Sequence, residues 1–275
     1  TYSITAVQVD KAGNESVASG ALSLIVDTTK PVAPAAPDLA AASDTKGTSI
    51  GTDTDNITSD TTPTITGLSE AGALVKLYKG TVQVGSATAN ENGVWEITSS
   101  VLAAGVNALT ATQTDKAGNV SLVSSALSID IWTTAPAAPG ALDLLTDSDT
   151  AGAGSTGTTI DNLTSVTTPT ITGTGSNGNE IILFKDADND GVVDTNERVG
   201  GATVANGKWS ITTSELSTGI NNLKAIQVDA VGKTSVASAA LAVTIDTTAP
   251  SVPTALDLAT TSDTGLLTSD NITSD

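Results

Sequence analysis

The five residues Asp27-Thr28-Thr29-Lys30-Pro31 return twice in altered form, as Trp132-Thr133-Thr134-Ala135-Pro136 and as Asp246-Thr247-Thr248-Ala249-Pro250. Each copy follows a run in which apolar residues alternate with others, and the first such run covers 22–26. Alternation with a period of two is typical of a half-buried β-strand. Proline fixes φ and has no N–H for a ladder, so each strand should end there. We therefore expect each copy to link the last strand of one unit to the first strand of the next.

The composition narrows the class of protein. The chain has 275 residues and a formal net charge of −19, which argues against nucleic acid or an anionic membrane surface as a partner. Cysteine, histidine and methionine are absent, which excludes disulfides, thiolate or imidazole metal sites and histidine-based catalysis. The remaining metal ligands are carboxylates, carbonyls and hydroxyls, which suit hard cations. No apolar run approaches membrane-spanning length, so we expect no membrane insertion, and no signal peptide is visible.

The same hairpin pattern precedes all three linkers. Residues 1–26 contain the turn Asp10-Lys11-Ala12-Gly13-Asn14 between two alternating runs. Similar turns at 115–119 and 229–233 are each followed by a run that ends at the next linker. Because an isolated hairpin is marginally stable in water, we expect 1–26 to be the last two strands of a truncated unit, and the chain to be part of a longer array.

Two complete units follow the first linker. We place unit two at 32–131 and unit three at 137–245, and a further truncated unit at 246–275. The linker prolines lie 105 and 114 positions apart, a repeat length that indicates separate domains in tandem. Each complete unit shows signals for seven short strands, which is typical of a β-sandwich of immunoglobulin type. The predicted fold is therefore all-β, with tandem immunoglobulin-like β-sandwiches arranged end to end.

Several short motifs carry a family resemblance: Asp-Asn-Ile-Thr at 55–58, Thr-Thr-Pro-Thr-Ile-Thr-Gly at 61–67, Asp-Lys-Ala-Gly-Asn at 115–119, Asp-Thr-Thr-Ala-Pro at 246–250 and Ser-Asp-Thr-Gly at 262–265. The combination resembles the tandem bacterial Ig-like (BIg) repeats of giant RTX, type I-secreted surface adhesins, and it covers essentially the whole chain. The resemblance implies an extracellular protein of the bacterial cell surface, with a role in adhesion and biofilm formation, whose repeats hold an adhesive tip away from the cell. It also implies calcium between domains. Trp132 departs from the pattern, because an aspartate is expected there.

Unit three is longer chiefly because of one insertion, between Phe184 and Val199. Its candidate ligands stand at loop positions 1, 3, 5, 7, 9 and 12, and are Asp186, Asp188, Asp190, Val192 through its carbonyl, Asp194 and Glu197. With Gly191 at position 6, this is the full EF-hand spacing, which predicts one bound Ca²⁺. Strands rather than helices flank the loop, so we expect a calcium-binding hairpin and not a helix-moving sensor. The alternative is a solvated acidic turn, but five carboxylates within twelve residues repel one another without a cation.

Aspartates near the linkers form a second group of candidate calcium ligands. Because strand direction alternates in such a sandwich, the loop that holds Asp44 and Asp55 should face the turn of the next unit. The predicted ligands are Asp27 and Asp115 at the first junction, Asp44, Asp55, Asp130 and Asp229 at the middle junction, and Asp149, Asp161 and Asp246 at the third. Trp132 cannot ligate, which weakens the middle site. The alternative is that these aspartates only cap turns, as aspartate commonly does.

The tryptophans have two predicted roles. Trp95 and Trp209 alternate with isoleucine at equivalent strand positions, so we predict that both fill the cores of their units. Trp132 lies on the middle linker, where we expect it to pack between domains rather than to recognise a ligand.

Three functions are compatible with these patterns. The one we favour is a calcium-stiffened structural spacer of a large bacterial adhesin, without catalysis, whose partners are neighbouring repeats and, through other domains, a host or surface receptor. The alternatives are a glycan- or protein-binding module and accessory domains of a secreted glycosidase. A glycosidase needs two opposed carboxylates in a cleft, and only the insertion gives a unit carboxylates that its neighbour lacks. Sugar platforms need exposed aromatic rings, and Trp132 is the only spare one.

Overall fold

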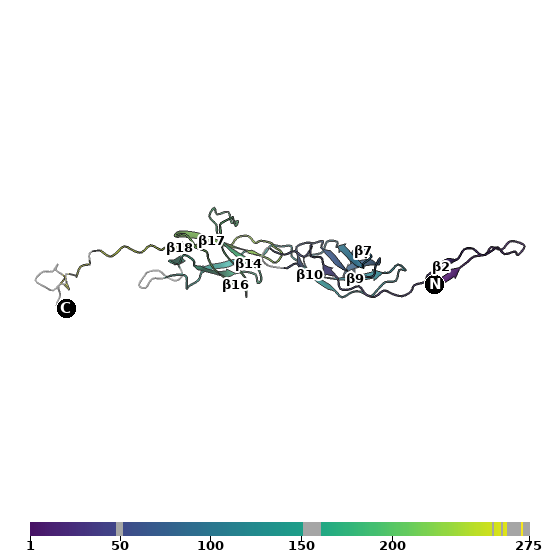
Figure 1. Cartoon of the computed structure of the whole chain (residues 1–275). Helices are drawn as coiled ribbons and strands as arrows, with labels where there is room; N and C mark the ends of the chain where they lie inside the picture. Colours follow the sequence, from purple (N-terminus) through teal and green to yellow (C-terminus); the bar gives the residue numbers. More distant parts are fainter. Residues whose placement is uncertain (48–51, 151–160, 255, 260, 263–270, 272–275) are drawn as a thin grey trace.

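The computed structural model describes residues 1–47, 52–150, 161–254, 256–259, 261–262 and 271. Figure 1 shows two β-sandwiches in line, with the N-terminal hairpin at one end and the C-terminal tail at the other. Every regular element in the described ranges is a β-strand, which confirms the predicted all-β class. Within these ranges there is no helix with the length and apolar character needed to cross a membrane. The polar loop expected in the last truncated unit falls largely outside the described residues.

Unit two consists of two packed sheets. The larger has the strand order β4-β10-β9-β6-β7 and the smaller has the order β3-β5-β8. The strands are β3 (Asp38–Leu39), β4 (Ile57–Thr58), β5 (Thr64–Leu68), β6 (Leu74–Lys79), β7 (Val82–Thr88), β8 (Val94–Thr98), β9 (Gly105–Thr114) and β10 (Leu127–Ile131). Alternate apolar side chains of both sheets point inward and form one hydrophobic core between them.

Unit three repeats this arrangement strand for strand. Its sheets have the orders β12-β18-β17-β14-β15 and β11-β13-β16. The strands are β11 (Gly140–Leu144), β12 (Leu163–Thr164), β13 (Thr170–Thr174), β14 (Glu180–Lys185), β15 (Arg198–Thr203), β16 (Lys208–Thr212), β17 (Gly219–Val228) and β18 (Leu241–Ile245). A second, separate hydrophobic core fills the space between them.

Each unit contains one strand more than the seven that the sequence predicts. The additional strand in unit two is β4, which pairs in parallel with β10 through Ile57 and Asp130; in unit three β12 pairs with β18 in the same way. Two residues are too few for a period-two pattern to reveal a strand. The pairing matters for function, because it fastens the loop that holds Asp44 and Asp55 to the end of the last strand.

The two predicted core tryptophans are indeed buried, with exposed fractions of 2% for Trp95 and 4% for Trp209. Each lies opposite a glycine of the neighbouring strand, Trp95 opposite Gly67 and Trp209 opposite Gly173. A Cβ atom on either glycine would clash with the indole ring. The largest side chain of each small core therefore packs over the smallest residue of the facing strand, which confirms the sequence-based prediction.

Serine side chains hold the hairpin that closes each unit. In unit two, Ser121 Oγ accepts a hydrogen bond from Gln113 N at 3.0 Å, and Ser124 Oγ accepts one from Ala111 N at 2.9 Å. The same pair of bonds recurs at Ser16, Ser19, Ser235 and Ser238. The N-terminal hairpin, with β1 (Tyr2–Ile4) and β2 (Leu22–Leu24), thus has the geometry of a closing hairpin. Its apolar side chains are exposed, whereas in the two complete units the apolar side chains that face the core are buried.

Candidate metal centre

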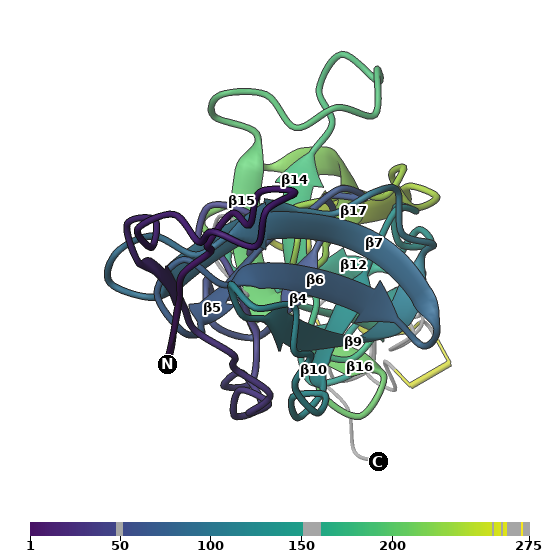
Figure 2. The same ribbon diagram turned by 90° about the vertical axis from the view of Figure 1, so that its right-hand side faces the viewer.

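The insertion of unit three forms a closed loop, 186–197, between β14 and β15. Two hydrogen bonds fix its base: Lys185 N donates to Glu197 O at 2.8 Å, and Asp186 N donates to Asn222 O of β17 at 3.2 Å. Gly191 adopts a φ of +76° at the sharp turn, where glycine is least strained. Figures 1 and 2 show the loop standing clear of the sandwich at its side, away from both linkers. A cation in this loop would therefore act within unit three and not across a junction.

The first half of the loop gathers three of the predicted ligands. One carboxylate oxygen from each of Asp186, Asp188 and Asp190 lies within 4.8 Å of the others, and this is the only such acidic group in the described part of the chain. Asp186 is 4% exposed. Its Oδ2 accepts hydrogen bonds from Gly191 N at 3.2 Å and from Lys224, whereas its Oδ1 is buried without a hydrogen-bond partner. A buried carboxylate oxygen without a partner is costly, and a cation would satisfy it.

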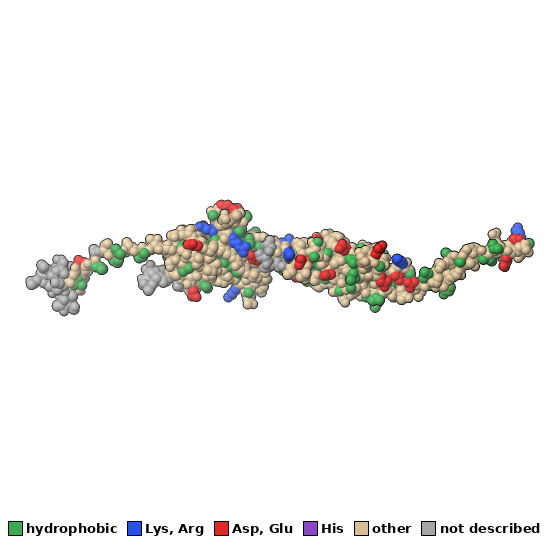
Figure 3. All heavy atoms as spheres, viewed as in Figure 1, with side chains coloured by type: hydrophobic (Ala, Val, Ile, Leu, Met, Phe, Trp, Pro, Cys, Tyr) green, Lys and Arg blue, Asp and Glu red, His purple; other side chains and the backbone are tan. Residues whose placement is uncertain are grey.

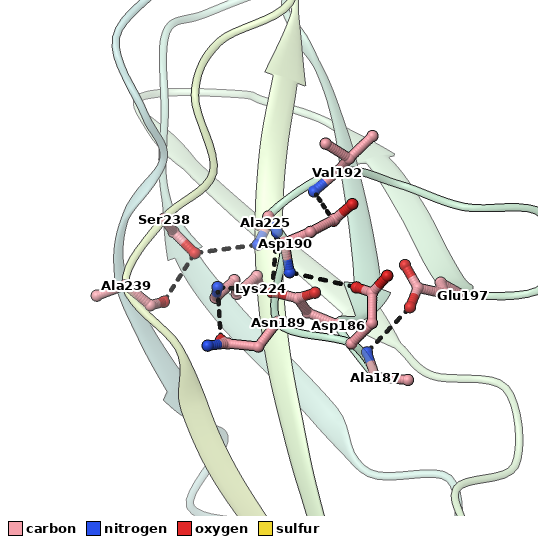
Figure 4. A network of polar contacts seen from close by, with 12 residues as sticks. Asp186, Ala187, Asn189, Asp190, Val192, Glu197, Lys224, Ala225, Ser238 and Ala239 are labelled. Carbon is pink, nitrogen blue, oxygen red and sulfur yellow. Dashed lines mark hydrogen bonds and ion pairs between the residues drawn. The ribbon is translucent and has the colours of Figure 1, made fainter.

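The second half of the loop points its carboxylates elsewhere. Glu197 accepts hydrogen bonds from two backbone N–H groups of the loop. One comes from Ala187 N at 2.9 Å (Figure 4), and the other from Asp194 N at 3.2 Å. Val192, which was expected to offer its carbonyl, donates its N–H to Asp190 Oδ1 at 2.7 Å. The structure therefore brings together Asp186, Asp188 and Asp190, and the carboxylates of Asp194 and Glu197 lie outside that group.

The electrostatics of the loop favour a cation. Partial desolvation of the exposed Asp194 carboxyl, followed by the negative charges of Asp190, Glu197 and Asp188, raises the pKa of Asp194. A pKa raised by like charges means that these groups destabilise one another when they are ionised. Figure 3 shows the resulting patch of acidic side chains at the tip of the loop. All donors are oxygen atoms, so the residues fit a hard divalent cation.

At the first junction the predicted ligands act mainly as turn caps. Asp27 Oδ1 accepts from Thr29 N at 2.9 Å, and Asp115 Oδ1 accepts from Ala117 N at 2.8 Å and Asn119 N at 2.9 Å. The hydrogen bond from the Asn119 side chain is the main cause that lowers the pKa of Asp115. Asp27, Asp115 and Glu70 nevertheless line one cavity of about 490 Å³. Glu70 was not predicted from the sequence, because it enters the junction from the turn between β5 and β6.

The polar loops keep their aspartates close together within each unit. Asp44 Oδ2 accepts from Asn56 N at 3.1 Å, and burial, then the charge of Asp55, raises the pKa of Asp44. In unit three, Asp149 Oδ2 accepts from Asn162 N at 3.2 Å, and burial, then the charge of Asp161, raises the pKa of Asp149. Among the described residues, the Oδ1 atoms of Asp44 and Asp149 are both buried without a hydrogen-bond partner. Asp44 and Asp149 are therefore the predicted junction ligands that each keep one buried carboxylate oxygen unsatisfied within that part of the chain.

The middle junction is joined by direct hydrogen bonding. Gly47 N of the unit-two loop donates to Ala230 O in the turn of unit three at 2.5 Å. Trp132 Nε1 donates to Asp130 Oδ2 at 2.9 Å. Asp130, Trp132 and Asp229 line a common cavity of about 480 Å³, and Asp229 caps its own turn through Val231 N and Lys233 N. The indole N–H thus satisfies one carboxylate oxygen of Asp130.

At the third junction Asp246 Oδ1 accepts a hydrogen bond from Thr248 N at 2.9 Å, which repeats the turn at Asp27.

A buried glutamine that the sequence did not predict fixes the residues after the first and middle linkers to the unit that follows. Gln113 Nε2 donates to Val32 O at 2.7 Å, and Gln227 Nε2 donates to Ala137 O. Both glutamines are buried, and their recurrence at the same position of each repeat was the available signal.

Comparisons with known proteins complete this description. A model of the bacterial Ig-like domain matches residues 31–132 and 138–247. Similar solved structures include the BSP domain of a biofilm-associated protein, with 17% identity, a TM-score of 0.26 and coverage of 70% of this chain and 29% of that one. They also include a 1.5-MDa bacterial ice-binding adhesin, with 17% identity, a TM-score of 0.35 and coverage of 87% of this chain and 73% of that one. The fibronectin(III)-like modules of Clostridium thermocellum CbhA match with 14% identity, a TM-score of 0.35 and coverage of 73% of this chain and 93% of that one. A search of curated proteins found no match.

Proposed function

Because the chain belongs to the bacterial Ig-like domain family, we propose that it serves as a series of structural spacer repeats in a large adhesin on the bacterial cell surface. The observation that carries this proposal is the in-line arrangement of two complete sandwiches with bonded junctions (Figure 1). A spacer must keep successive units from folding back on one another. Its partners are the neighbouring repeats, and a host or surface receptor is contacted by other domains. We assign no catalytic role to these repeats.

Stiffness at the junctions follows from three features of the chain. Linkers of five residues end in proline, which limits their freedom. The buried Gln113 and Gln227 hold the residues that follow each linker against the unit they enter. At the middle junction, Gly47 and Ala230 bond directly across the two units. Each feature removes a degree of freedom that an unrestrained linker would keep.

We propose that calcium supplies further stiffness and stability. The support is the cluster of Asp186, Asp188 and Asp190, with the buried and unpaired Oδ1 of Asp186. Calcium suits this group better than magnesium, because calcium accepts irregular sets of six to eight oxygens whereas magnesium demands near-ideal octahedral geometry. At the first and third junctions, the acidic groups around Asp27 and Asp149 are the candidates for bridging ions. Extracellular calcium concentrations fit weak sites of this kind.

Small-angle X-ray scattering of the 275-residue chain tests the spacer role. With millimolar calcium the chain should be extended and stiff, and with chelator it should sample shorter dimensions and greater flexibility. A compact particle in calcium would overturn the spacer. Equal dimensions and flexibility in the two buffers would leave a spacer that calcium does not stiffen.

A binding module is the second candidate, and one observation favours it. The outer face of the smaller sheet of unit three carries a largely apolar groove of about 680 Å³, lined among others by Thr172, Lys208 and Trp209. Trp209 is almost fully buried, so the groove lacks the exposed aromatic platform that sugar binding uses. A glycan array would decide, since specific binding that Lys208→Ala removes would support the module. A screen for glycoside hydrolysis would test the remaining alternative, an accessory part of a glycosidase.

A further inference from the structure

A lysine from the sheet reaches into the insertion. Lys224 lies on β17, and its side chain is only 15% exposed. Its Nζ lies 2.6 Å from Asp186 Oδ2 and donates to Asn189 Oδ1 at 3.2 Å. Figure 4 shows the ammonium group between these two loop residues, at the base of the acidic group. One positive charge thus connects loop positions 1 and 4 to a strand that is remote in sequence.

The repeat supplies a natural comparison for this lysine. In unit three Phe184 pairs with Lys224 across β14 and β17, and in unit two the corresponding pair across β6 and β9 is Tyr78 with Thr110. Unit two lacks the insertion, because only residues 80–81 connect β6 to β7. A largely buried ammonium needs a negative partner, and unit two offers none at that place. The lysine therefore accompanies the insertion rather than the sandwich.

Asp186 divides its two oxygens between different kinds of partner. Oδ2 accepts from Gly191 N and from Lys224, and the hydrogen bond from Lys224 is the main cause that lowers the pKa of Asp186. Oδ1 is buried and has no hydrogen-bond partner. Lys224 consequently offsets one negative charge of the loop, and it leaves Oδ1 of Asp186 available to a cation.

We propose that Lys224 is a built-in substitute for part of the cation's charge: it fastens the insertion to β17 when no divalent cation is bound, and it weakens cation binding when one is. This inference rests on the proposed cation site in the loop. The physical reason for the second effect is repulsion, because a unit charge a few ångströms from a divalent ion lowers its affinity roughly tenfold even with water-like screening. The insertion then stays ordered in the absence of calcium and responds only to high calcium concentrations, such as those outside cells.

The test uses Lys224→Met in the 275-residue chain, with hydrogen exchange of residues 186–197 and calorimetric titration with CaCl₂ as the two measurements. In chelator the exchange of this segment should rise about tenfold or more relative to wild type, and calcium should restore its protection. The dissociation constant for calcium should fall roughly tenfold. Lys185→Met is the matched control, because Lys185 Nζ bonds only Ser217 at the base of the same hairpin; it should change either measurement less than threefold.

A second variant at the same position distinguishes loss of the ion pair from misfolding of unit three. Lys224→Thr copies Thr110 of unit two, so the sandwich should accept it, and unchanged exchange in the core strands of unit three verifies folding. Unchanged exchange of 186–197 in chelator would overturn the proposal that Lys224 anchors the loop. Weaker calcium binding in either variant would overturn the proposal that Lys224 replaces part of the cation's charge. A wild-type chain that binds no calcium would overturn the cation site and this second role together, while exchange in chelator would still decide whether Lys224 anchors the loop.

Discussion

Units two and three have cores of the same design, and they differ on one outer face. In both cores a buried tryptophan packs over a glycine, Trp95 over Gly67 and Trp209 over Gly173. On the outer face, Phe184 of unit three is fully buried beside the insertion, whereas its counterpart Tyr78 in unit two is only half-buried. A hairpin of this sandwich can therefore carry an acidic insertion without a change in the core, because the insertion lies outside the core.

The largest expected effects concern the tryptophans in the cores of the two units. Trp95→Ala and Trp209→Ala should each lower the free energy of unfolding by about 3–5 kcal/mol, the usual cost of emptying a buried aromatic site. Trp209 Nε1 donates to Thr174 O at 3.2 Å, whereas Trp95 Nε1 has no partner. Trp209→Ala should therefore be the costlier of the two by about 1 kcal/mol. Urea unfolding of the full chain measures both, and a loss below about 1 kcal/mol would mean that the indole contributes little to the core.

The next effect separates the units by their response to calcium. At a hundredfold excess over the dissociation constant, one bound ion should stabilise unit three by about 2.7 kcal/mol, with a smaller effect on unit two. The double substitution Asp188→Ala with Glu197→Ala should abolish the difference, and Glu215→Ala, an exposed carboxylate outside the insertion, should preserve it. Hydrogen exchange resolved for each unit gives the measurement. Equal calcium responses of wild type and double variant would rule out the insertion as the site.

The linkers and the acidic spacing made much of this molecule predictable. Three copies of one linker motif in a fixed register led to tandem sandwiches, and the family match confirms the resemblance drawn from the same motifs. The spacing of Asp186, Asp188 and Asp190 predicted a group that the structure does bring together. The ligand spacing is informative here because residues that lie close together in the sequence of a short loop also lie close together in space.

Other features depend on strands that meet only in the fold. Lys224 reaches the insertion from β17, and Glu70 reaches the first junction from a separate turn. No spacing in the sequence encodes such contacts. Glu197 accepts hydrogen bonds from two backbone N–H groups of the loop and lies outside the group of three aspartates, an arrangement that ligand spacing alone does not predict.

A smaller effect, expected in both units, concerns the linker contacts. Gln113→Leu and Gln227→Leu should each cost about 1–3 kcal/mol, because buried backbone groups lose their partners. In unit three these partners are Ala137 O, Ser176 N and the Asn179 side chain. Urea unfolding detects the loss in stability, and increased hydrogen exchange at 32–37 or 137–142 would report the released linker. A stability loss with no change in exchange there would show that the glutamines support the unit and not the linker.

The smallest expected effects are opposite pH dependences at two aspartates, measured in chelator. Burial, then the charges of Asp161 and Asp143, raises the pKa of Asp149, so its stabilising contribution is complete below the unfolded value of about 3.9 and is lost as pH rises through the folded pKa. The pKa of Asp115 is lowered, chiefly by Asn119, so its contribution is present above the unfolded value and is lost as pH falls through the folded pKa. Asp149→Asn should therefore stabilise at pH 7 and Asp115→Asn should destabilise, and both differences should shrink in acid. Thermal unfolding between pH 3 and pH 7 checks the two signs, and a shared sign would contradict this assignment.

The two junctions inside the described chain give the most direct test of calcium stiffening. The chain has no cysteine, so pairs of spin labels can be placed cleanly at Ser23→Cys with Gln83→Cys across the first junction, and at Gln83→Cys with Ser210→Cys across the middle one. Pulsed electron paramagnetic resonance then gives the distribution of distances across each junction. The account predicts narrow distributions for both pairs in millimolar calcium. Chelator should broaden the first pair markedly and leave the second nearly unchanged, because the Gly47–Ala230 hydrogen bond joins the two units at the middle junction without an ion. A first-junction distribution that is the same with and without calcium would contradict the calcium-stiffened spacer.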